Sequence, residues 1–203
     1  MANEDVTQEA RLLRLAEAKG VLRTRDLQEH AIPRVYLRRL VERGLLFQSG
    51  RGLYLPADAD LSEHHSLAVA CRRVPSGVIC LLSALSFHGI GSQLPSQVWI
   101  AIAKGVWRPQ VDYPRLRIVH MSGAPMTTAV DEHVVEGVPV HVFSPAKTVA
   151  DCFRFRNRIG VDVAIEALRV YHRERRGTMD DLMACARADR VDKVMLPYLE
   201  SLA

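Results

Sequence analysis

Apolar positions along residues 20–55 predict two short helices followed by a hairpin. In the second of these helices Leu37, Leu40 and Val41 recur at i, i+3 and i+4, which places them on one helix face. Gly44 is typical of the residue that ends such a helix in the left-handed conformation. The face formed by these three residues is therefore expected to pack against a core, with the other positions open to solvent.

The residues at the predicted element ends support this interpretation. We expect Thr24 to cap a short helix that ends near His30, because its hydroxyl can accept a backbone N–H. Pro33 suits the first position of the next helix, where its missing N–H costs nothing. Two apolar runs then flank a basic turn and predict a strand–turn–strand unit over residues 45–47, 49–52 and 53–55. The whole pattern is that of a helix-turn-helix followed by a wing.

The rest of the chain predicts an α+β protein with two parts. A polar break at 56–60 indicates a domain boundary, so we expect a winged helix-turn-helix domain over residues 1–60 and a mixed helix-and-sheet domain over 61–203. A first helix is predicted at 5–18, with Val6 among its apolar residues. The second domain is expected to contain helices at 62–74, 82–88, 145–156, 160–175 and 178–188, a short final helix, strands at 98–103 and 116–120, and a hairpin at 134–143 that turns at Glu136-Gly137.

Arginine is concentrated in the predicted winged helix. Residues 21–55 hold seven arginines and three acidic residues, a net charge of +4 that equals the formal charge of the whole chain, so the other 168 of the 203 residues balance to about zero. A basic face on a small helical module is typical of proteins that bind the phosphate backbone of DNA. The alternatives are a solvated helix face and a winged helix that binds RNA or protein.

The predicted DNA contacts follow from this pattern. We expect the helix from Pro33 to Arg43 to enter the major groove and Arg51 to reach the minor groove or the backbone from the wing tip. Tyr36 is a further candidate contact, with a place in the core as the alternative. The candidate DNA-binding residues are Arg23, Arg25, Arg34, Tyr36, Arg38, Arg39 and Arg51.

A second basic cluster lies in the predicted C-terminal domain. Residues 147–176 hold eight basic and four acidic residues, a net charge of +4. Local pairs such as Lys147 with Asp151 at i, i+4 favour solvated helices, whereas a second nucleic-acid surface is the functional alternative. The residues of that candidate surface are Lys147, Arg154, Arg156 and Arg158.

The residues do not favour an enzyme, a cofactor or a metal site. Ser83, His88 and Asp151 lack the sequence context of a nucleophile elbow, and paired carboxylates at the spacing used to hold magnesium are missing. The four cysteines match no zinc pattern and are expected to be reduced and buried. A polar start and the lack of a long apolar run predict a cytoplasmic protein without a membrane span.

Several segments carry a resemblance to a known family. The chain resembles the AbiEi-type antitoxins of type IV toxin–antitoxin systems in five segments. These are AEAKGVLRTRDL, VYLRRLVERGLL, GRGLYLP, LLSALSFHGIGSQLP and SPAKTVADCFRFRN. The resemblance implies a repressor that binds inverted repeats in double-stranded DNA at its own promoter. It also implies that the second domain counteracts a nucleotidyltransferase toxin without a stable complex. The alternative is a solitary regulator whose C-terminal domain binds RNA or protein. The oligomeric state stays open, including a monomer that binds cooperatively.

Overall fold

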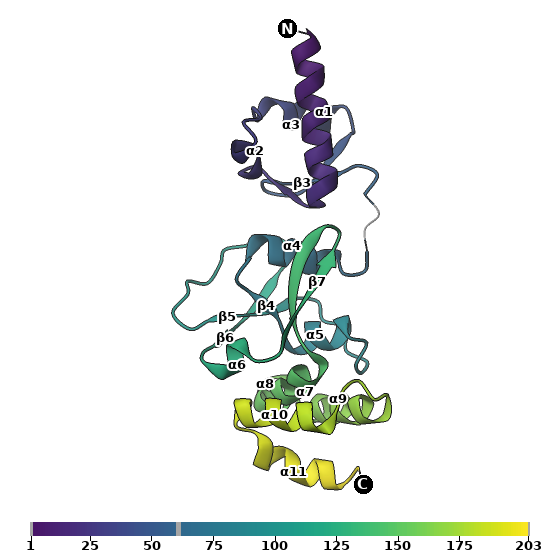
Figure 1. Cartoon of the computed structure of the whole chain (residues 1–203), viewed down its shortest axis with the longest axis vertical. Helices are drawn as coiled ribbons and strands as arrows, with labels where there is room; N and C mark the ends of the chain where they lie inside the picture. The colour runs from purple at the N-terminus through teal and green to yellow at the C-terminus, as the bar shows by residue number, and fades with distance from the viewer. Residues whose placement is uncertain (1, 60–61, 203) are drawn as a thin grey trace.

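The computed structural model describes residues 2–59 and 62–202, and it places the elements in three tiers along the long axis of the molecule (Figure 1). The N-terminal helices and their small sheet occupy one end, a larger sheet lies in the middle, and the last helices occupy the other end. The fold is α+β, as predicted. The predicted boundary between residues 60 and 61 lies outside the described residues, as does the side chain of Val6.

The N-terminal part is a winged helix-turn-helix. Its sheet is antiparallel with the order β1-β3-β2, and β2 and β3 form the predicted wing. Leu12 and Ala16 of the first helix pack with Leu37 and Leu40 of the third in one buried cluster. The elements are α1 (Ala2–Lys19), β1 (Leu22–Arg23), α2 (Asp26–Glu29), α3 (Val35–Glu42), β2 (Leu46–Gly50) and β3 (Leu53–Pro56).

The ends of these helices agree with the sequence prediction at Gly44 and differ from it at Thr24 and Pro33. Gly44 adopts a φ of +68° directly after α3 and its N–H donates to the Val41 carbonyl, as expected for a helix end. Thr24 does not cap α2: its N–H and hydroxyl both donate to the Gly52 carbonyl, at 3.0 and 3.4 Å. A tertiary contact with the wing therefore replaces the predicted local cap. Pro33 precedes α3 by two residues instead of opening it.

The second part is built on a five-stranded mixed sheet with the order β6-β5-β4-β8-β7. The β4–β8 and β5–β6 pairs are parallel, and the other two pairs are antiparallel. Its strands are β4 (Val78–Ile79), β5 (Val98–Ala103), β6 (Leu116–Met121), β7 (Val130–Val135) and β8 (Val138–Phe143). Its helices are α4 (His65–Arg73), α5 (Leu81–Phe87), α6 (Ala124–Thr127), α7 (Pro145–Arg154), α8 (Arg156–Ile159), α9 (Val161–Arg173), α10 (Met179–Asp189) and α11 (Asp192–Glu200).

Strand β5 is apolar at every position from Val98 to Ile102 because both faces of the sheet are covered. Trp99 and Ala101 pack with the cluster that includes α7, α9 and α10, whereas Ile100 and Ile102 pack with the cluster that includes α4. Adjacent side chains of a strand point to opposite faces, so a continuous apolar run marks a central strand. The sheet thus separates the C-terminal helices from the winged-helix side.

Local signals fixed several other elements of this part. The turn between β7 and β8 falls at Glu136-Gly137, where both residues have positive φ, as in a type I′ hairpin. Ser144 caps α7 by accepting the Lys147 N–H at 3.3 Å. Thr178 and Asp181 form a complete capping box at the start of α10. The predicted hairpin turn is confirmed, and each helix cap is formed by two residues three positions apart.

The two parts share a core. Val21, Leu53 and Leu55 come from the winged helix, yet they are buried in the cluster that contains α4 and strands β5 and β8. Different wing side chains thus pack on the two sides, Leu46 in the core of the winged helix and Leu53 and Leu55 against the second part. The winged helix is therefore held by burial of apolar surface against the second part as well as by its own core.

A close backbone approach reinforces this junction. Gly20 has a φ of +61°, and a Cβ placed on it would lie 1.4 Å from the Glu136 carbonyl oxygen in the β7–β8 turn. The Glu136 carboxylate in turn accepts from the N–H and hydroxyl of Ser62, at 2.8 and 3.0 Å, and lies 2.7 Å from Nδ1 of His65. The hairpin turn therefore touches α1 and the start of α4 together.

All four cysteines are buried as free thiols. Burial raises the pKa of Cys71 to about 12, although a backbone hydrogen bond near His141 opposes the shift. Burial also raises the pKa values of the Cys80 and Cys152 thiols above their usual range. These groups are small apolar core residues, as their spacing predicted.

Substituting Gly20 tests the junction. We expect Gly20→Ala to lower the free energy of unfolding by about 3 kcal/mol or more, because the new Cβ overlaps a backbone carbonyl and adds left-handed strain. Gly44→Ala is the matched control: its φ is also positive, but nothing lies within 4 Å of its Cβ position, so only about 1 kcal/mol of strain is expected. Equal losses in thermal and urea unfolding would show that the contact at Gly20 is unimportant.

Candidate nucleic-acid interface

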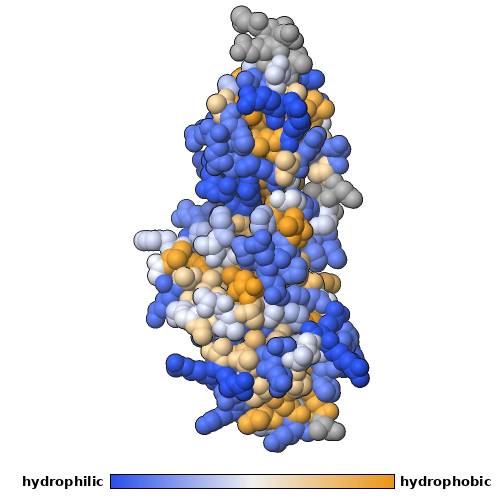
Figure 2. All heavy atoms as spheres, in the orientation of Figure 1, coloured by the Kyte–Doolittle hydropathy of each residue, from blue (hydrophilic) through white to orange (hydrophobic). Residues whose placement is uncertain are grey.

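The solvent-facing side of α3 carries the basic residues predicted to meet DNA. Leu37 and Leu40 are buried, so the helix is fixed with Arg34, Arg38 and Arg39 exposed. Strongly hydrophilic residues gather over this end of the molecule (Figure 2). The separation into apolar and basic sides follows directly from the i, i+3, i+4 spacing.

Tyr36 lies on the other side of the helix. The residue is 8% exposed and belongs to the core of the winged helix, so the structure corrects its inclusion among the DNA-contacting residues. The Arg39 guanidinium carbon lies 5.4 Å from the centre of the Tyr36 ring, within the range of a cation–π contact. The Tyr36 ring thus packs against the side chain of the exposed Arg39.

The exposed arginines differ in their partners. Arg38 donates to Glu42 at 2.7 Å, an i, i+4 pair on the open surface, where solvent screens the attraction. Arg43 pairs with Glu9 of α1. Within residues 2–59 and 62–202, the Arg34 side chain has neither an ion pair nor a hydrogen bond. A phosphate or a base edge can therefore compete for Arg38 and engage Arg34 directly.

Arg23 has a structural role instead of an exposed one. Its Nε and NH2 groups donate to Asp26 at 3.1 and 2.9 Å, and its NH1 donates to the Arg72 carbonyl at 3.2 Å. Arg72, from α4, donates to Asp26 at 2.7 Å and to the Val21 carbonyl at 2.9 Å. Asp26 is fully buried. The guanidinium of Arg23 is committed to this junction, which disfavours its predicted contact with DNA.

The Asp26 carboxylate keeps its charge in this setting. Burial acts to raise its pKa, but hydrogen bonds from Arg23 and the charges of Arg72 and Arg23 outweigh that effect, and the pKa is lowered below its ordinary value of 3.8. A sequence pattern could not identify Arg72 as a partner, because 46 residues separate it from Asp26.

Arg25 and Arg51 lie at the turn where α2 meets the wing, and both are exposed. Gly52, with a φ of +69°, allows the wing turn to approach Thr24 closely. In the part of the chain that the structure describes, neither arginine side chain has an ion pair. Both positions remain compatible with contact to a DNA backbone.

The four residues predicted to form a second nucleic-acid surface do not all lie on the surface. Lys147 is fully buried, and its Nζ donates to Asp151 at 2.6 Å and to Asp189 at 3.1 Å. Its inclusion in a second nucleic-acid surface is therefore wrong. A buried ammonium needs such partners, and here α7 and α10 supply one carboxylate each. Burial raises the pKa of Asp151 above its usual range, and the charge of Lys147 opposes that shift.

The other members of the cluster are only partly available. Arg154 pairs with the buried Asp189 at 3.3 Å, and Arg156 donates to the Phe153 carbonyl at 2.8 Å. Arg158 is exposed and lies 5.8 Å from the centre of the Phe155 ring. Packing and pairing thus account for three of the four candidate residues.

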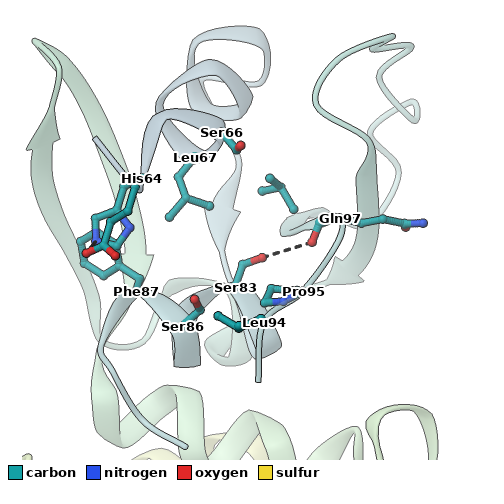
Figure 3. A pocket seen from close by; sticks show the side chains of 11 residues that line it. His64, Ser66, Leu67, Ser83, Ser86, Phe87, Leu94, Pro95 and Gln97 are labelled. Atoms are coloured by element: carbon teal, nitrogen blue, oxygen red, sulfur yellow. Dashed lines mark hydrogen bonds and ion pairs between the residues drawn. The ribbon is translucent and has the colours of Figure 1, made fainter. Parts of the chain in front are cut away.

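The residues considered for a catalytic triad have separate partners. Ser83 donates to the Gln97 carbonyl at 3.4 Å and accepts the Trp99 N–H at 2.9 Å at the edge of a cavity (Figure 3). His88 lies 2.8 Å from the Phe143 carbonyl, and Asp151 is paired with Lys147. These three residues therefore have separate structural partners and do not form one site.

Residues 2–59 and 62–202 hold no group of three or more His, Cys, Asp or Glu side chains placed to share a metal ion. None of their helices has the length and apolar character needed to cross a membrane.

The helices, the wing and the exposed arginines of α3 define the N-terminal part as a winged helix-turn-helix domain. Residues 10–57 match the family described as transcriptional regulator, AbiEi antitoxin, and this part of the chain is a domain of that family. No curated protein matches the chain. Among solved structures, the chain is similar to the RV2827C protein from Mycobacterium tuberculosis, with 15% identity and a TM-score of 0.47 over 90% of this chain and 81% of the other.

The Asp26 junction gives a pH-dependent prediction. A carboxyl whose pKa is lowered on folding stabilises the folded state above its unfolded pKa and loses that contribution as pH falls through the folded pKa. We expect Asp26→Asn to cost about 2–3 kcal/mol at pH 7. The difference from wild type should shrink as pH falls below about 4.

Urea unfolding between pH 7 and pH 3 measures this difference. Asp58→Asn, at an exposed acid of the same domain, is the control and should change stability little. A loss for Asp26→Asn that stays constant down to pH 3 would argue against an ionised Asp26 at the junction.

Proposed function

We propose that this chain is a sequence-specific DNA-binding transcriptional repressor that uses α3 as its recognition helix. The observation that carries the proposal is the exposed row of Arg34, Arg38 and Arg39 on a helix whose opposite face is buried. The family match of residues 10–57 supports the same class of function. A regulator of this class acts in the cytoplasm, where its operator DNA lies.

The residues of α3 divide between two kinds of contact. Arginine can fork onto the O6 and N7 atoms of guanine or onto a phosphate, so Arg34, Arg38 and Arg39 are the proposed readers in the major groove. Val35 is 50% exposed at the start of the helix and is suited to contact a thymine methyl group. Val35 was not among the predicted contacts, because an apolar residue in a helix is ordinarily assigned to the core.

The wing and the start of α2 provide contacts that do not depend on sequence. Arg51 at the wing turn and Arg25 before α2 are proposed to meet the phosphate backbone or the adjacent minor groove. Two copies on inverted repeats would present two recognition helices to successive major grooves. The described residues are those of one copy, so cooperative binding by monomers and a dimer are both compatible with this arrangement.

We further propose that the second part provides an antitoxin function against a nucleotidyltransferase toxin, without a stable complex. This proposal is supported by the family description of the winged helix as an AbiEi antitoxin regulator. A solitary regulator is the alternative. The arrangement of Ser83, His88 and Asp151 in packing roles gives no support to a hydrolytic function for this part.

Substitutions on α3 test the repressor proposal. We expect Arg34→Ala, Arg38→Ala or Arg39→Ala to weaken binding to the promoter of its own gene by about 1–3 kcal/mol. A base-reading arginine should also relax preference at one base pair, whereas a phosphate contact should weaken all duplexes alike. Fluorescence anisotropy and footprinting at fixed salt measure both effects.

Arg169→Ala is the matched control, because Arg169 is an exposed arginine on α9, far along the chain from the winged helix. Its affinity for the promoter should equal that of wild type. Unchanged footprints for all three α3 variants would overturn the assignment of α3 as the recognition helix.

Co-expression tests the antitoxin proposal. Where a neighbouring gene encodes a nucleotidyltransferase that arrests growth, co-expression of this chain should restore growth, and residues 62–203 carry the expected activity. The Arg38→Ala variant of the full chain should restore growth as well as wild type does, because it affects DNA binding alone. Continued arrest in the presence of the full chain, or a genome with no such neighbour, would favour the solitary regulator.

A further inference from the structure

A hollow of about 230 Å³ lies where the wing meets the second part. We call it the arginine hollow. The winged helix supplies one wall and the end of α4 supplies the other. Its lining residues are Arg23, Thr24, Arg25, Arg51, Gly52, Arg72 and Arg73. Five of the seven are arginines, drawn from three separate segments of the chain, so the concentration of charge arises only on folding.

The positive charge of this hollow is only partly neutralised. Asp26 neutralises one charge by binding Arg23 and Arg72 together. Asp112, in the β5–β6 loop, is the acidic group whose charge acts on Arg73. The exposed Arg25 and Arg51 lack ion pairs within residues 2–59 and 62–202. Crowded arginines repel one another, so the arrangement favours an anion as a ligand.

Arg73 connects the hollow to the wing. Its NH2 group donates to the Arg51 carbonyl at 2.5 Å, and its buried Nε has no hydrogen-bond partner among the described residues. No carboxylate of the described residues binds it directly. Arg73 therefore holds the backbone of the wing turn while its charge stays available, in contrast to Arg72, which Asp26 already engages.

We propose that the arginine hollow binds a phosphodiester of the DNA backbone, with Arg73 of the second part as a contact in addition to Arg25 and Arg51. The inference rests on the proposed DNA-binding function and extends it beyond the winged helix. Arginine matches the geometry of a phosphate oxygen pair, and Arg25, Arg51 and Arg73 line the same hollow. The second part is thereby a direct participant in DNA binding.

The competing explanation is that these arginines serve only to join the two parts. Arg23 and Arg72 do serve that purpose through Asp26. The side chains of Arg25 and Arg51 make no such contact, and Arg73 joins the parts through the Arg51 backbone carbonyl, for which a formal charge is unnecessary. A measurement that responds to charge and not to folding therefore separates the two explanations.

The test uses the full-length protein and its promoter duplex at several salt concentrations. We expect Arg73→Gln to weaken binding about five- to tenfold and to reduce the slope of log affinity against log salt by about one, since one phosphate contact is lost. Arg73→Lys keeps the charge and should retain the slope. Arg169→Gln, at an exposed arginine of α9, is the matched control and should leave both quantities unchanged.

A second variant changes the charge without touching the wing. Asp112 is exposed, and Asp112→Asn should tighten binding severalfold because it removes the acidic group that acts on Arg73. Thermal unfolding of each variant shows whether the fold is intact. Inorganic phosphate and sulfate, added separately, show whether a free anion occupies the hollow; competition with duplex binding that is lost in Arg73→Gln supports the shared site.

The outcomes separate the two proposals. If wild type binds its promoter with sequence preference but Arg73→Gln and Asp112→Asn leave affinity and salt slope unchanged, the arginine hollow is not a phosphate site and the repressor proposal stands. If Arg73→Gln weakens binding with an unchanged salt slope, its role is structural and the inference is overturned. If wild type binds no duplex, both proposals fall.

Discussion

The buried carboxylate of Asp26 is the constraint on which the arrangement of this protein depends. A charge removed from water is costly unless it is fully paired, and Asp26 obtains that pairing from Arg23 beside it and from Arg72 of α4. The same contacts therefore pair the carboxylate at the start of α2 and attach the winged helix to the second part. The direction in which α3 presents its arginines follows from this attachment, because α3 packs on the same small core.

The arginines of the winged helix divide into two groups by environment. Arg23 is held inside the junction, whereas Arg34 and Arg51 remain exposed with side chains that no described carboxylate engages. A charge count cannot make this distinction, since it weighs each guanidinium equally. The division also explains why a strongly basic segment folds stably: the arginine closest to the core is matched by a carboxylate, and the remaining positive charge is spread over solvent-facing positions.

Features set by neighbouring residues could be predicted from the sequence, and features set by distant ones could not. Gly44 and the Glu136-Gly137 turn depend on a few adjacent residues, and each was confirmed. Lys147 shows the limit. With Asp151 at i, i+4 it has the pattern of a solvated pair, but Asp189, which follows 42 residues later, encloses it. Thr24 and Tyr36 were likewise assigned by local rules. In the structure Thr24 bonds to the wing and Tyr36 is buried in the core.

The shared core has a consequence for how such regulators diversify. Leu53 and Leu55 of the wing are buried among residues of α4 and the larger sheet, and Gly20 leaves room for the Glu136 carbonyl. A recombination event that joined this winged helix to an unrelated partner would expose those leucines to water and leave the glycine without its neighbour. Change in what the protein recognises is therefore expected to proceed by single substitutions on the outer side of α3, with the two halves inherited together.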